Sequence, residues 1–419
     1  MIITANKIIT GDGKTILNNS VVCINERGII ETVGTLDEVK AKYPNEEIRD
    51  FGDATIMPGM FDMHAHLGYW YSQPDSFNYN DQMIMMYALQ HAQAAFTKGI
   101  TSVRDCYSPH GVCKTLKLAE SKGFITIPRI THVDAGMCMT GGHCWDEVVQ
   151  VDGPWEIRKE IRKQMRDGAE WIKLLTSHRS HIPEFTQEEL DAAVDECHRR
   201  GIKCVVHAGT HPSIQMCIDA GFDTIEHGTF LTVEQAEQMR DKGIAWTPTI
   251  FAYTYLYEVC KKNIEEGNAD VFNDPVAAKE QRDYAYYEPA YESYRDNFKK
   301  LYDTGVTVCT GSDMVMYGAP VLPIAEEMSY MVKYGITPVQ AVQTSTSNPA
   351  KVLGKGDELG LIEEGYIADI TVVDGDLSQN IDCIKNINTV YLNGKAVYSD
   401  GVRFISVSYT HLTLPTIRL

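Results

Sequence analysis

The sequence predicts an α/β protein: a (β/α)8 TIM barrel with a small β-sandwich domain that the N- and C-terminal segments form together. Between Pro58 and about Asn348, short apolar runs alternate with amphipathic helical stretches, as in βα units around a parallel sheet. Eight such runs over roughly 290 residues match the size of a TIM barrel, whose active site lies at the carboxyl ends of its strands. Before and after this region, short β-branched runs are separated by turn residues.

The eight apolar runs are the expected barrel strands. In chain order they read IMPGMFDMHAH, GITSVRDC, RITHVDA, AEWIKLLT, IKCVVHAG, FDTIEHG, GIAWTPTI and GVTVCTGSD. A doubly wound open sheet is the alternative architecture. It is disfavoured because no glycine-rich phosphate-binding turn follows the first run.

The domain boundaries follow from the same patterns. We expect residues 1–56 and 349–406 to form the β-sandwich, 57–348 to form the barrel with an insertion at 251–304, and 407–419 to be a non-native tail. The last expectation arises because the ten residues from Val407 are the in-frame translation of a common sequencing-library adapter.

The insertion is long for a connection inside a compact barrel, which predicts a functional segment. It carries nine tyrosines, and Tyr284, Tyr287, Tyr291 and Tyr294 share one face of a helix. Two interpretations stay open. The stripe packs on the outer helices of the barrel, or it belongs to a lid that lines a substrate pocket.

The chain is acidic, with 38 Lys and Arg against 57 Asp and Glu and a formal net charge of −19. This charge repels phosphate backbones and anionic lipid heads, so we expect neither a nucleic-acid nor a membrane partner. The absence of a long apolar stretch and of a basic, then apolar leader predicts a cytoplasmic protein. Eleven cysteines without a C-x-x-C pair predict reduced, buried thiols. We also expect a homo-oligomer that acts on a small-molecule substrate.

Polar residues stand at the carboxyl ends of five predicted strands. They are His64 and His66 in the first run, Lys173 in the fourth, His207 in the fifth, His227 in the sixth and Asp313 in the eighth. Residues two apart in a strand face the same side, so His64 and His66 can share one metal ion. Each histidine taken alone can equally be a satisfied core residue, and Asp313 can instead cap the next helix.

Lys173 lies inside an apolar strand, where an unpaired ammonium is costly to bury because desolvation disfavours its charged form. A neutral lysine can react with carbon dioxide, and the resulting carbamate offers two anionic oxygens that can bridge two cations. Neutral imidazoles together with anionic oxygens are ligands suited to zinc or a similar divalent ion.

The combination of PGMFDMHAH, WIKLL, VVHAG, IEHGTFL, TGSD and GLIEEGYIADITVVDGD resembles the amidohydrolase superfamily over roughly residues 1–400. Within it, the chain looks most like the imidazolonepropionase-like and dipeptidase-like branch. The resemblance implies a centre of two divalent metal ions, with zinc as the expected metal. In that centre His64, His66 and Asp313 bind the first ion, His207 and His227 bind the second, and a carboxylated Lys173 bridges both.

By the same resemblance, a hydroxide between the two ions attacks the substrate and Asp313 carries the proton. We therefore expect hydrolysis of a C–N amide bond, in a dipeptide or an N-acyl amino acid. No carboxylate follows His207 before Asp219, which disfavours a single-metal deaminase and weakens the case for an imidazolonepropionase. A cyclic amide or lactone hydrolase is the second hypothesis, and a non-catalytic barrel scaffold is the third.

Four further residues are candidate substrate contacts. His143 ends a Thr-Gly-Gly-His loop that is similar to a substrate-facing loop of that branch, although it can be a plain turn residue. Arg179 with His181 can bind a free carboxylate, or belong to a solvated basic loop. Tyr253, just past the seventh run, can donate to an oxyanion or simply pack.

Overall fold

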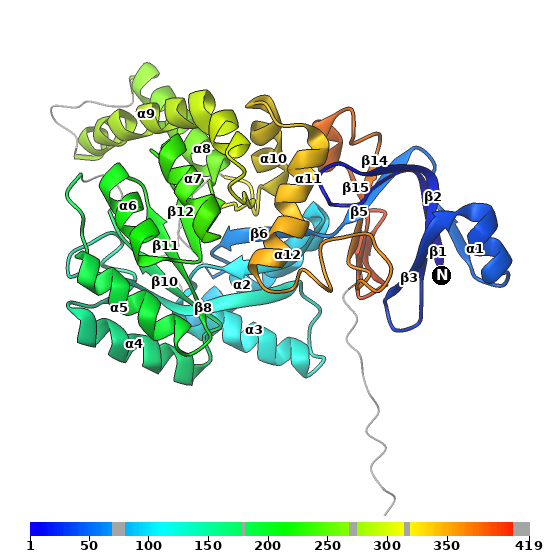
Figure 1. The fold of residues 1–419 in the computed structure, drawn as a ribbon, viewed down its shortest axis with the longest axis horizontal. Helices are drawn as coiled ribbons and strands as arrows, with labels where there is room; N and C mark the ends of the chain where they lie inside the picture. The colour runs from blue at the N-terminus through cyan, green and yellow to red at the C-terminus, as the bar shows by residue number, and fades with distance from the viewer. Residues whose placement is uncertain (69–79, 178–180, 268–274, 314–318, 405–419) are drawn as a thin grey trace, which may run out of the picture.

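The computed structural model describes residues 1–68, 80–177, 181–267, 275–313 and 319–404, with the backbone alone for 275–282. The expected tail at 407–419 therefore lies outside the described residues. The chain forms a barrel and a separate β-domain that lie side by side (Figure 1).

The barrel is built from parallel strands in sequence order, as predicted. Its hydrogen-bonded strands are β6 (Met60–Ala65), β7 (Ile100–Asp105), β8 (Arg129–Cys138), β10 (Trp171–Leu175), β11 (Lys203–Ala208), β12 (Thr224–His227) and β13 (Ala245–Thr247), and the short β9 (Val149–Gln150) pairs with β8. The eighth run is less regular, but it still closes the barrel. Val308 bridges to Trp246 on one side, and the Met63 N–H donates to the Thr310 carbonyl at 2.9 Å on the other.

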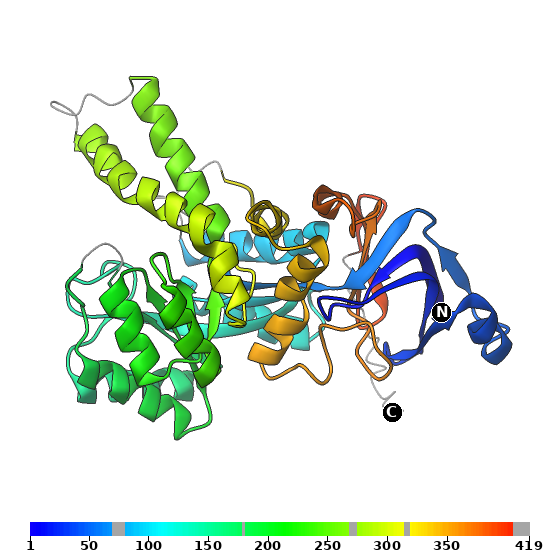
Figure 2. The ribbon, with the colours of Figure 1, turned by 45° about the horizontal axis from the view of Figure 1, so that its top comes forward.

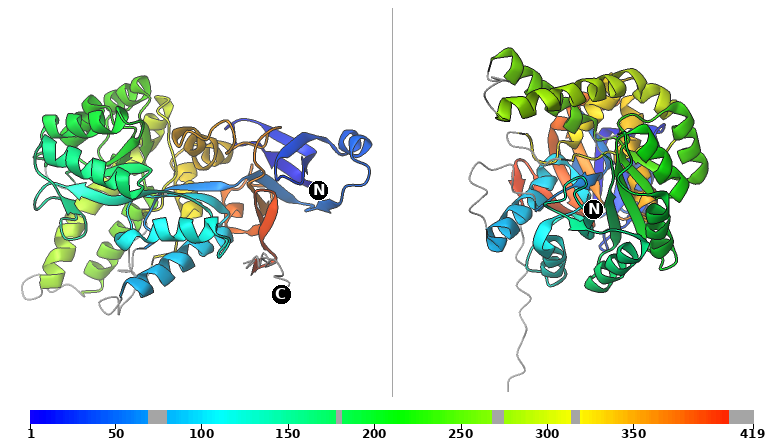
Figure 3. Two further views of the ribbon diagram at one scale, coloured as in Figure 1. Left: turned by 90° about the horizontal axis from the view of Figure 1, so that it is seen from below. Right: turned by 90° about the vertical axis from the view of Figure 1, so that its left-hand side faces the viewer.

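Helices surround these strands as an outer layer (Figure 3). They are α2 (Asp81–Ala94), α3 (Val112–Ser121), α4 (Pro154–Asp167), α5 (Gln187–His198), α6 (His211–Ala220), α7 (Val233–Lys242), α10 (Ile324–Lys333), α11 (Pro338–Ser345) and the short α12 (Ser347–Val352). Local sequence sets their ends. Thr186 and Glu189 form a capping box at the start of α5, and Gly221 ends α6 in the left-handed conformation.

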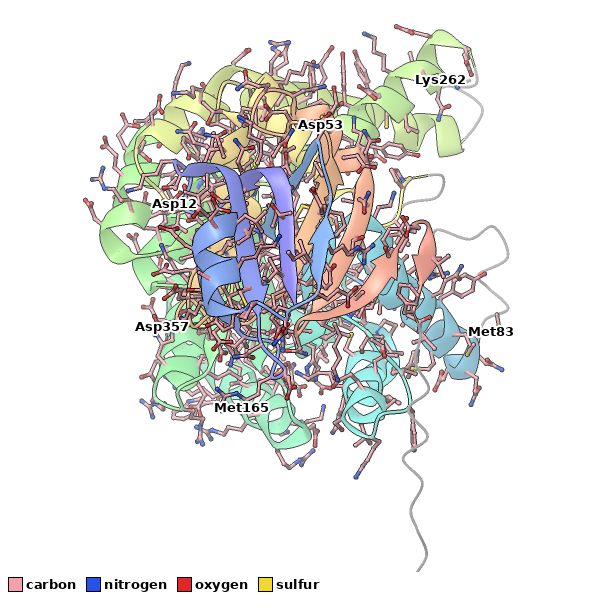
Figure 4. All side chains as sticks on the ribbon, turned by 90° about the vertical axis from the view of Figure 1, so that its right-hand side faces the viewer. Asp12, Asp53, Met83, Met165, Lys262 and Asp357 are labelled. Atoms are coloured by element: carbon pink, nitrogen blue, oxygen red, sulfur yellow. The ribbon has the colours of Figure 1, made fainter. Side chains whose placement is uncertain are left out.

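The insertion forms two antiparallel helices, α8 (Ile250–Glu265) and α9 (Pro275–Asp303), whose outer end projects from the barrel (Figure 2). Lys262 lies towards that outer end (Figure 4). Tyr287 and Tyr294 of the predicted stripe are buried, and Tyr287 lines the main cavity. Tyr294 is buried, as expected of a stripe that packs on the barrel, and Tyr287 lines the cavity, as expected of a stripe that faces a pocket. A lid function stays a prediction.

The small β-domain takes strands from both ends of the chain, as predicted. They are β1 (Ile2–Ile9), β2 (Ile16–Ile24), β3 (Ile30–Thr35), β4 (Ile48–Asp50), β5 (Ala54–Pro58), β14 (Ile370–Asp374), β15 (Ile387–Leu392), β16 (Lys395–Ser399) and β17 (Val402–Arg403), with the helix α1 (Leu36–Lys42) beside them. Antiparallel pairing of β5 with β14, with Ile56 opposite Val372, joins the two ends. The sheet thus extends to Pro58, two residues past the expected boundary.

All eleven cysteines are free thiols and most are buried, as their scattered spacing predicted. Within the described residues, no helix combines the length and the apolar character that a bilayer crossing needs.

A buried carboxylate fastens α5 to α4. Glu196 accepts hydrogen bonds from Arg162 at 2.9 Å and Arg158 at 3.2 Å, and it pairs with Arg200, just past the end of α5. The hydrogen bonds from Arg162, then those from Arg200 and Arg158, lower the pKa of Glu196 to about 2, against the effect of its burial. Because this folded-state pKa is depressed, the stabilisation is present above the ordinary glutamate range and is lost as pH falls towards 2.

Glu196→Gln should lower the free energy of unfolding at pH 7 by about 1–2 kcal/mol, because a neutral amide cannot pair with three guanidinium groups. Thermal unfolding of wild type and variant at pH 7 and pH 3 measures this difference, which should shrink at the lower pH. Glu188→Gln, at an exposed position of the same helix, is the matched control. An equal loss at both pH values would contradict the electrostatic origin.

Candidate active site

A cavity of about 590 Å³ opens at the carboxyl ends of the barrel strands. All six residues at the predicted strand ends line it, namely His64, His66, Lys173, His207, His227 and Asp313. They come from β6, β10, β11, β12 and the eighth run, so the barrel brings together residues that are far apart in the sequence.

Three imidazoles converge on the carboxylate of Asp313. Oδ1 of Asp313 lies 3.4 Å from His64 Nε2 and 3.3 Å from His66 Nε2, and Oδ2 lies 3.7 Å from His227 Nδ1. Burial alone would raise the pKa of Asp313, but the neighbouring His64 and His227 and the hydrogen bond from His66 bring it well below its usual range. This carboxylate is therefore ionised at neutral pH.

The remaining imidazoles extend the cluster across the cavity. The ring of His227 lies 4.3 Å from that of His207, and the ring of His207 lies 4.3 Å from that of His143. Burial lowers the pKa of His227 to about 4 and brings the pKa of His64 well below its ordinary value. Both rings are therefore neutral at pH 7, the form in which imidazole binds a metal.

Hydrogen bonds on the far side of two rings set the atoms that face the cavity. His64 Nδ1 lies 2.6 Å from a carboxylate oxygen of Glu226, and His66 Nδ1 lies 2.7 Å from the Tyr107 carbonyl. Since a carbonyl or carboxylate oxygen only accepts, each Nδ1 carries the proton. Nε2 of each ring is thereby the atom that faces Asp313, and a ring held through its Nδ1 in this way is typical of metal-binding histidines.

Backbone strain is concentrated around this cluster. His227, Thr249 and Asp313 have φ values of 63°, 51° and 46°, a left-handed region that side chains other than glycine rarely adopt. The Asp313 N–H donates to the His64 carbonyl at 2.7 Å, which holds the strained residue against β6. Strain of this kind persists where the surrounding structure fixes it, and it is common at functional sites.

Lys173 is 2% exposed, and its Nζ has no hydrogen-bond partner within the described part of the chain. A buried ammonium without a partner is strongly disfavoured. Its amine lies in the same cavity as the four imidazoles and Asp313. Two divalent ions with a carbamate on Lys173 would fit this donor set. The ligand atoms of His64, His66 and Asp313 already lie within 4.8 Å of one another.

A buried charged pair beneath the cavity was not predicted. Arg104 donates to Glu226 at 2.8 Å and to the Met63 carbonyl at 2.7 Å, and both charged side chains are fully buried. Glu226 lies on the same side of β12 as Thr224, two residues before it, and its carboxylate accepts from the Thr224 hydroxyl at 2.7 Å. Strict alternation would then turn His227 away, but the left-handed φ of His227 breaks the alternation, so both Glu226 and His227 lie against His64.

The candidate substrate contacts have different outcomes. His143 and Tyr253 line the cavity, and the Tyr253 ring lies 5.4 Å from that of His227. Burial raises the pKa of Tyr253 well above its ordinary value, so its hydroxyl keeps its proton at neutral pH. His181 is exposed and is not among the described residues that line the cavity. Arg179 lies outside the described residues.

Two glutamates also line the cavity and were not singled out from the sequence. They are Glu147, in the loop after β8, and Glu184, in the loop after β10. Loop residues have no periodicity that tells which side chains turn inwards, so no signal in the sequence marked these two glutamates.

Comparison with known proteins agrees with this geometry. The model of the amidohydrolase family matches residues 55–397. A crystal structure of a Xaa-Pro dipeptidase with methionine bound in its active site superposes with a TM-score of 0.82 at 28% identity, covering 95% of this chain and 99% of the other. The ochratoxinase of Aspergillus niger is 27% identical, over 96% of this chain and 87% of its own. The imidazolonepropionase of Brevibacillus brevis is 22% identical, over 90% and 89%.

The family match spans the whole barrel and the C-terminal strands of the β-domain, and the similar proteins include hydrolases of C–N bonds that this chain matches along nearly its whole length. The chain belongs to the amidohydrolase family and is a hydrolase that acts on carbon–nitrogen bonds.

Proposed function

We propose that the protein is a metal-dependent amidohydrolase that cleaves the amide bond of a dipeptide or an N-acyl amino acid. The observation that carries this proposal is the buried, unpartnered Lys173 amine in one cavity with the imidazoles and Asp313. Such an amine is expected in a protein that converts it to a carbamate and uses it to hold cations.

In this proposal His64, His66 and Asp313 would hold one divalent ion, His207 and His227 would hold the second, and a carbamate on Lys173 would supply anionic oxygens to the centre. Zinc is the first candidate, because neutral imidazoles and carboxylate oxygens are among its usual ligands. When bound, two such ions lower the pKa of a water molecule to near neutrality and polarise the amide carbonyl.

The chain's own residues supply the proton transfer. Asp313 is ionised and lies among the ligands, so its free oxygen can accept a proton and return it to the leaving nitrogen. Tyr253 keeps its hydroxyl proton and lines the cavity beside His227, so it can donate to the oxygen that becomes negative during attack.

The similar proteins support an amino-acid leaving group. The Xaa-Pro dipeptidase crystal structure holds methionine in its active site, and that protein matches this chain at nearly full length. A cyclic amide is the second candidate, favoured by the similarity to imidazolonepropionase. The absence of a carboxylate shortly after His207 argues against it.

The test is a turnover screen of zinc-loaded protein against dipeptides and N-acyl amino acids, with lactones and cyclic ureides as controls. Release of a free amino acid from at least one acyclic amide is the expected result. Turnover of lactones or cyclic ureides without turnover of any acyclic amide would overturn the proposal. Metal analysis should find about two divalent ions per chain.

Glu226→Gln should weaken divalent-ion binding by about 10- to 100-fold, because it disturbs the partner that orients a ligand. A neutral amide cannot satisfy both the Arg104 guanidinium and His64 Nδ1, so the ring loses its fixed orientation. Competition with a chelator measures the affinity, and Glu234→Gln, at an exposed position of α7, is the control. Unchanged affinity in a less stable variant would show that Glu226 serves only the fold.

A further inference from the structure

The wall of the cavity carries two carboxylates that the proposed chemistry does not use. Glu147 and Glu184 are both partly buried, and neither forms an ion pair within the described residues. Besides Lys173, which the proposed function consumes as a carbamate, the described lining contains no lysine or arginine. Glu147 and Glu184 are therefore carboxylates of the described wall that the proposed chemistry leaves unused.

The position of Glu184 is fixed by the loop that carries His143. One oxygen of Glu184 accepts the His143 N–H at 3.1 Å, and the same oxygen lies 2.9 Å from where a side-chain carbon on Gly142 would be. The glycine thus makes room for the carboxylate. His143 in turn lies against His207, so Glu184 is tied to the edge of the candidate metal centre.

Glu147 lines the same cavity near His66, and the two are linked through Tyr107. The Tyr107 hydroxyl donates to the Glu147 carbonyl, and the Tyr107 carbonyl accepts from His66, so one residue holds both. Burial raises the pKa of Glu184, because desolvation disfavours its ionised form. A bound cation would remove this desolvation penalty.

We infer that Glu147 and Glu184 select substrates that carry an aliphatic cation, an ammonium or a guanidinium, in addition to the scissile amide. This inference rests on the proposed function and specifies its substrate class. An ammonium or guanidinium can donate charge-assisted hydrogen bonds to either carboxylate, whereas a neutral chain of equal length leaves both desolvated. Basic dipeptides and acyl derivatives of basic amino acids have the required chemistry.

The test is calorimetric binding of two matched ligand pairs to zinc-loaded protein. ε-Aminocaproate is compared with heptanoate, and L-lysine with its isostere in which a methyl group replaces the ammonium. At least one charged ligand should bind about tenfold more tightly than its neutral partner, and the preference should fall in Glu147→Gln or Glu184→Gln. Asp146→Asn, which removes an exposed charge from the same loop, should retain the preference.

Equal or tighter binding of the neutral ligand in both pairs would overturn the inference, and so would a preference that neither glutamine variant reduces. The glutamine of Glu184→Gln can still accept the His143 N–H, so the loop that carries His143 keeps this hydrogen bond. A reduced preference for the charged ligand in this variant is therefore not explained by a displaced loop. Binding needs no turnover. A protein that hydrolyses neutral N-acyl amino acids without any charge preference would retain the proposed function and lose only this inference.

Discussion

Replacing Lys173 with alanine is expected to lower the rate of amide hydrolysis by at least about 10³-fold, because several kcal/mol of charge stabilisation by the metal centre depend on it. No other described lysine lines the cavity, so no neighbour can form the carbamate in its place. The kcat/KM of the best substrate and the metal content are measured together. The variant should hold fewer divalent ions than the wild type.

Lys163→Ala, at an exposed position of α4, is the matched control and should retain the wild-type rate. Metal-stripped wild-type protein should regain more activity when bicarbonate is added with zinc than with zinc alone. The Lys173→Ala variant should not respond to bicarbonate. A wild-type rate in Lys173→Ala would exclude a bridged two-metal mechanism.

Asp313→Asn is expected to lower kcat by about 10²- to 10⁴-fold, the range in which general acid–base catalysis contributes. Asparagine keeps the size of the side chain but cannot take up the proton and return it to the leaving nitrogen. Its amide also replaces one of the oxygens that faces His64 and His66. The measurement is kcat at saturating substrate, in protein with a known metal content.

Asp303→Asn, at an exposed position near the end of α9, controls for the loss of one negative charge. A kcat for Asp313→Asn within a few-fold of wild type, at full metal content, would assign the proton transfer to another group.

The barrel could be predicted because its strands are regular. Each apolar run is long enough to be identified as a strand. Polar residues at the carboxyl ends of five runs indicate the end of the barrel at which the active site lies. The eighth run is the least regular of the predicted barrel strands. It contains the left-handed Asp313, and it pairs through isolated hydrogen bonds instead of a continuous ladder.

What the sequence could not predict depends on departures from regularity. His227 faces the cavity although its neighbour Glu226 already lies on the interior side of β12, and a periodic pattern contains no trace of the left-handed φ that turns His227. Arg104 was hidden for a different reason: a charged side chain in a strand interior has its partner on a distant strand. In the loop after β10, the sequence indicated Arg179 as a substrate contact, and Arg179 lies outside the described residues. Glu184 of the same loop lines the cavity and was not indicated.

The pairing of β5 with β14 has a consequence for the nascent chain. Ile56 of β5 cannot pair with Val372 of β14 until roughly 300 further residues have been synthesised. This takes about 15 to 60 s at ordinary rates of translation. Apart from the closure of β6 on the eighth run, barrel strands pair with neighbours one βα unit away, whereas one edge of β5 stays unpaired until β14 is made. An open strand edge is a template for association with other chains. Until β14 is made, this edge of β5 is therefore a site at which nascent chains can associate with one another.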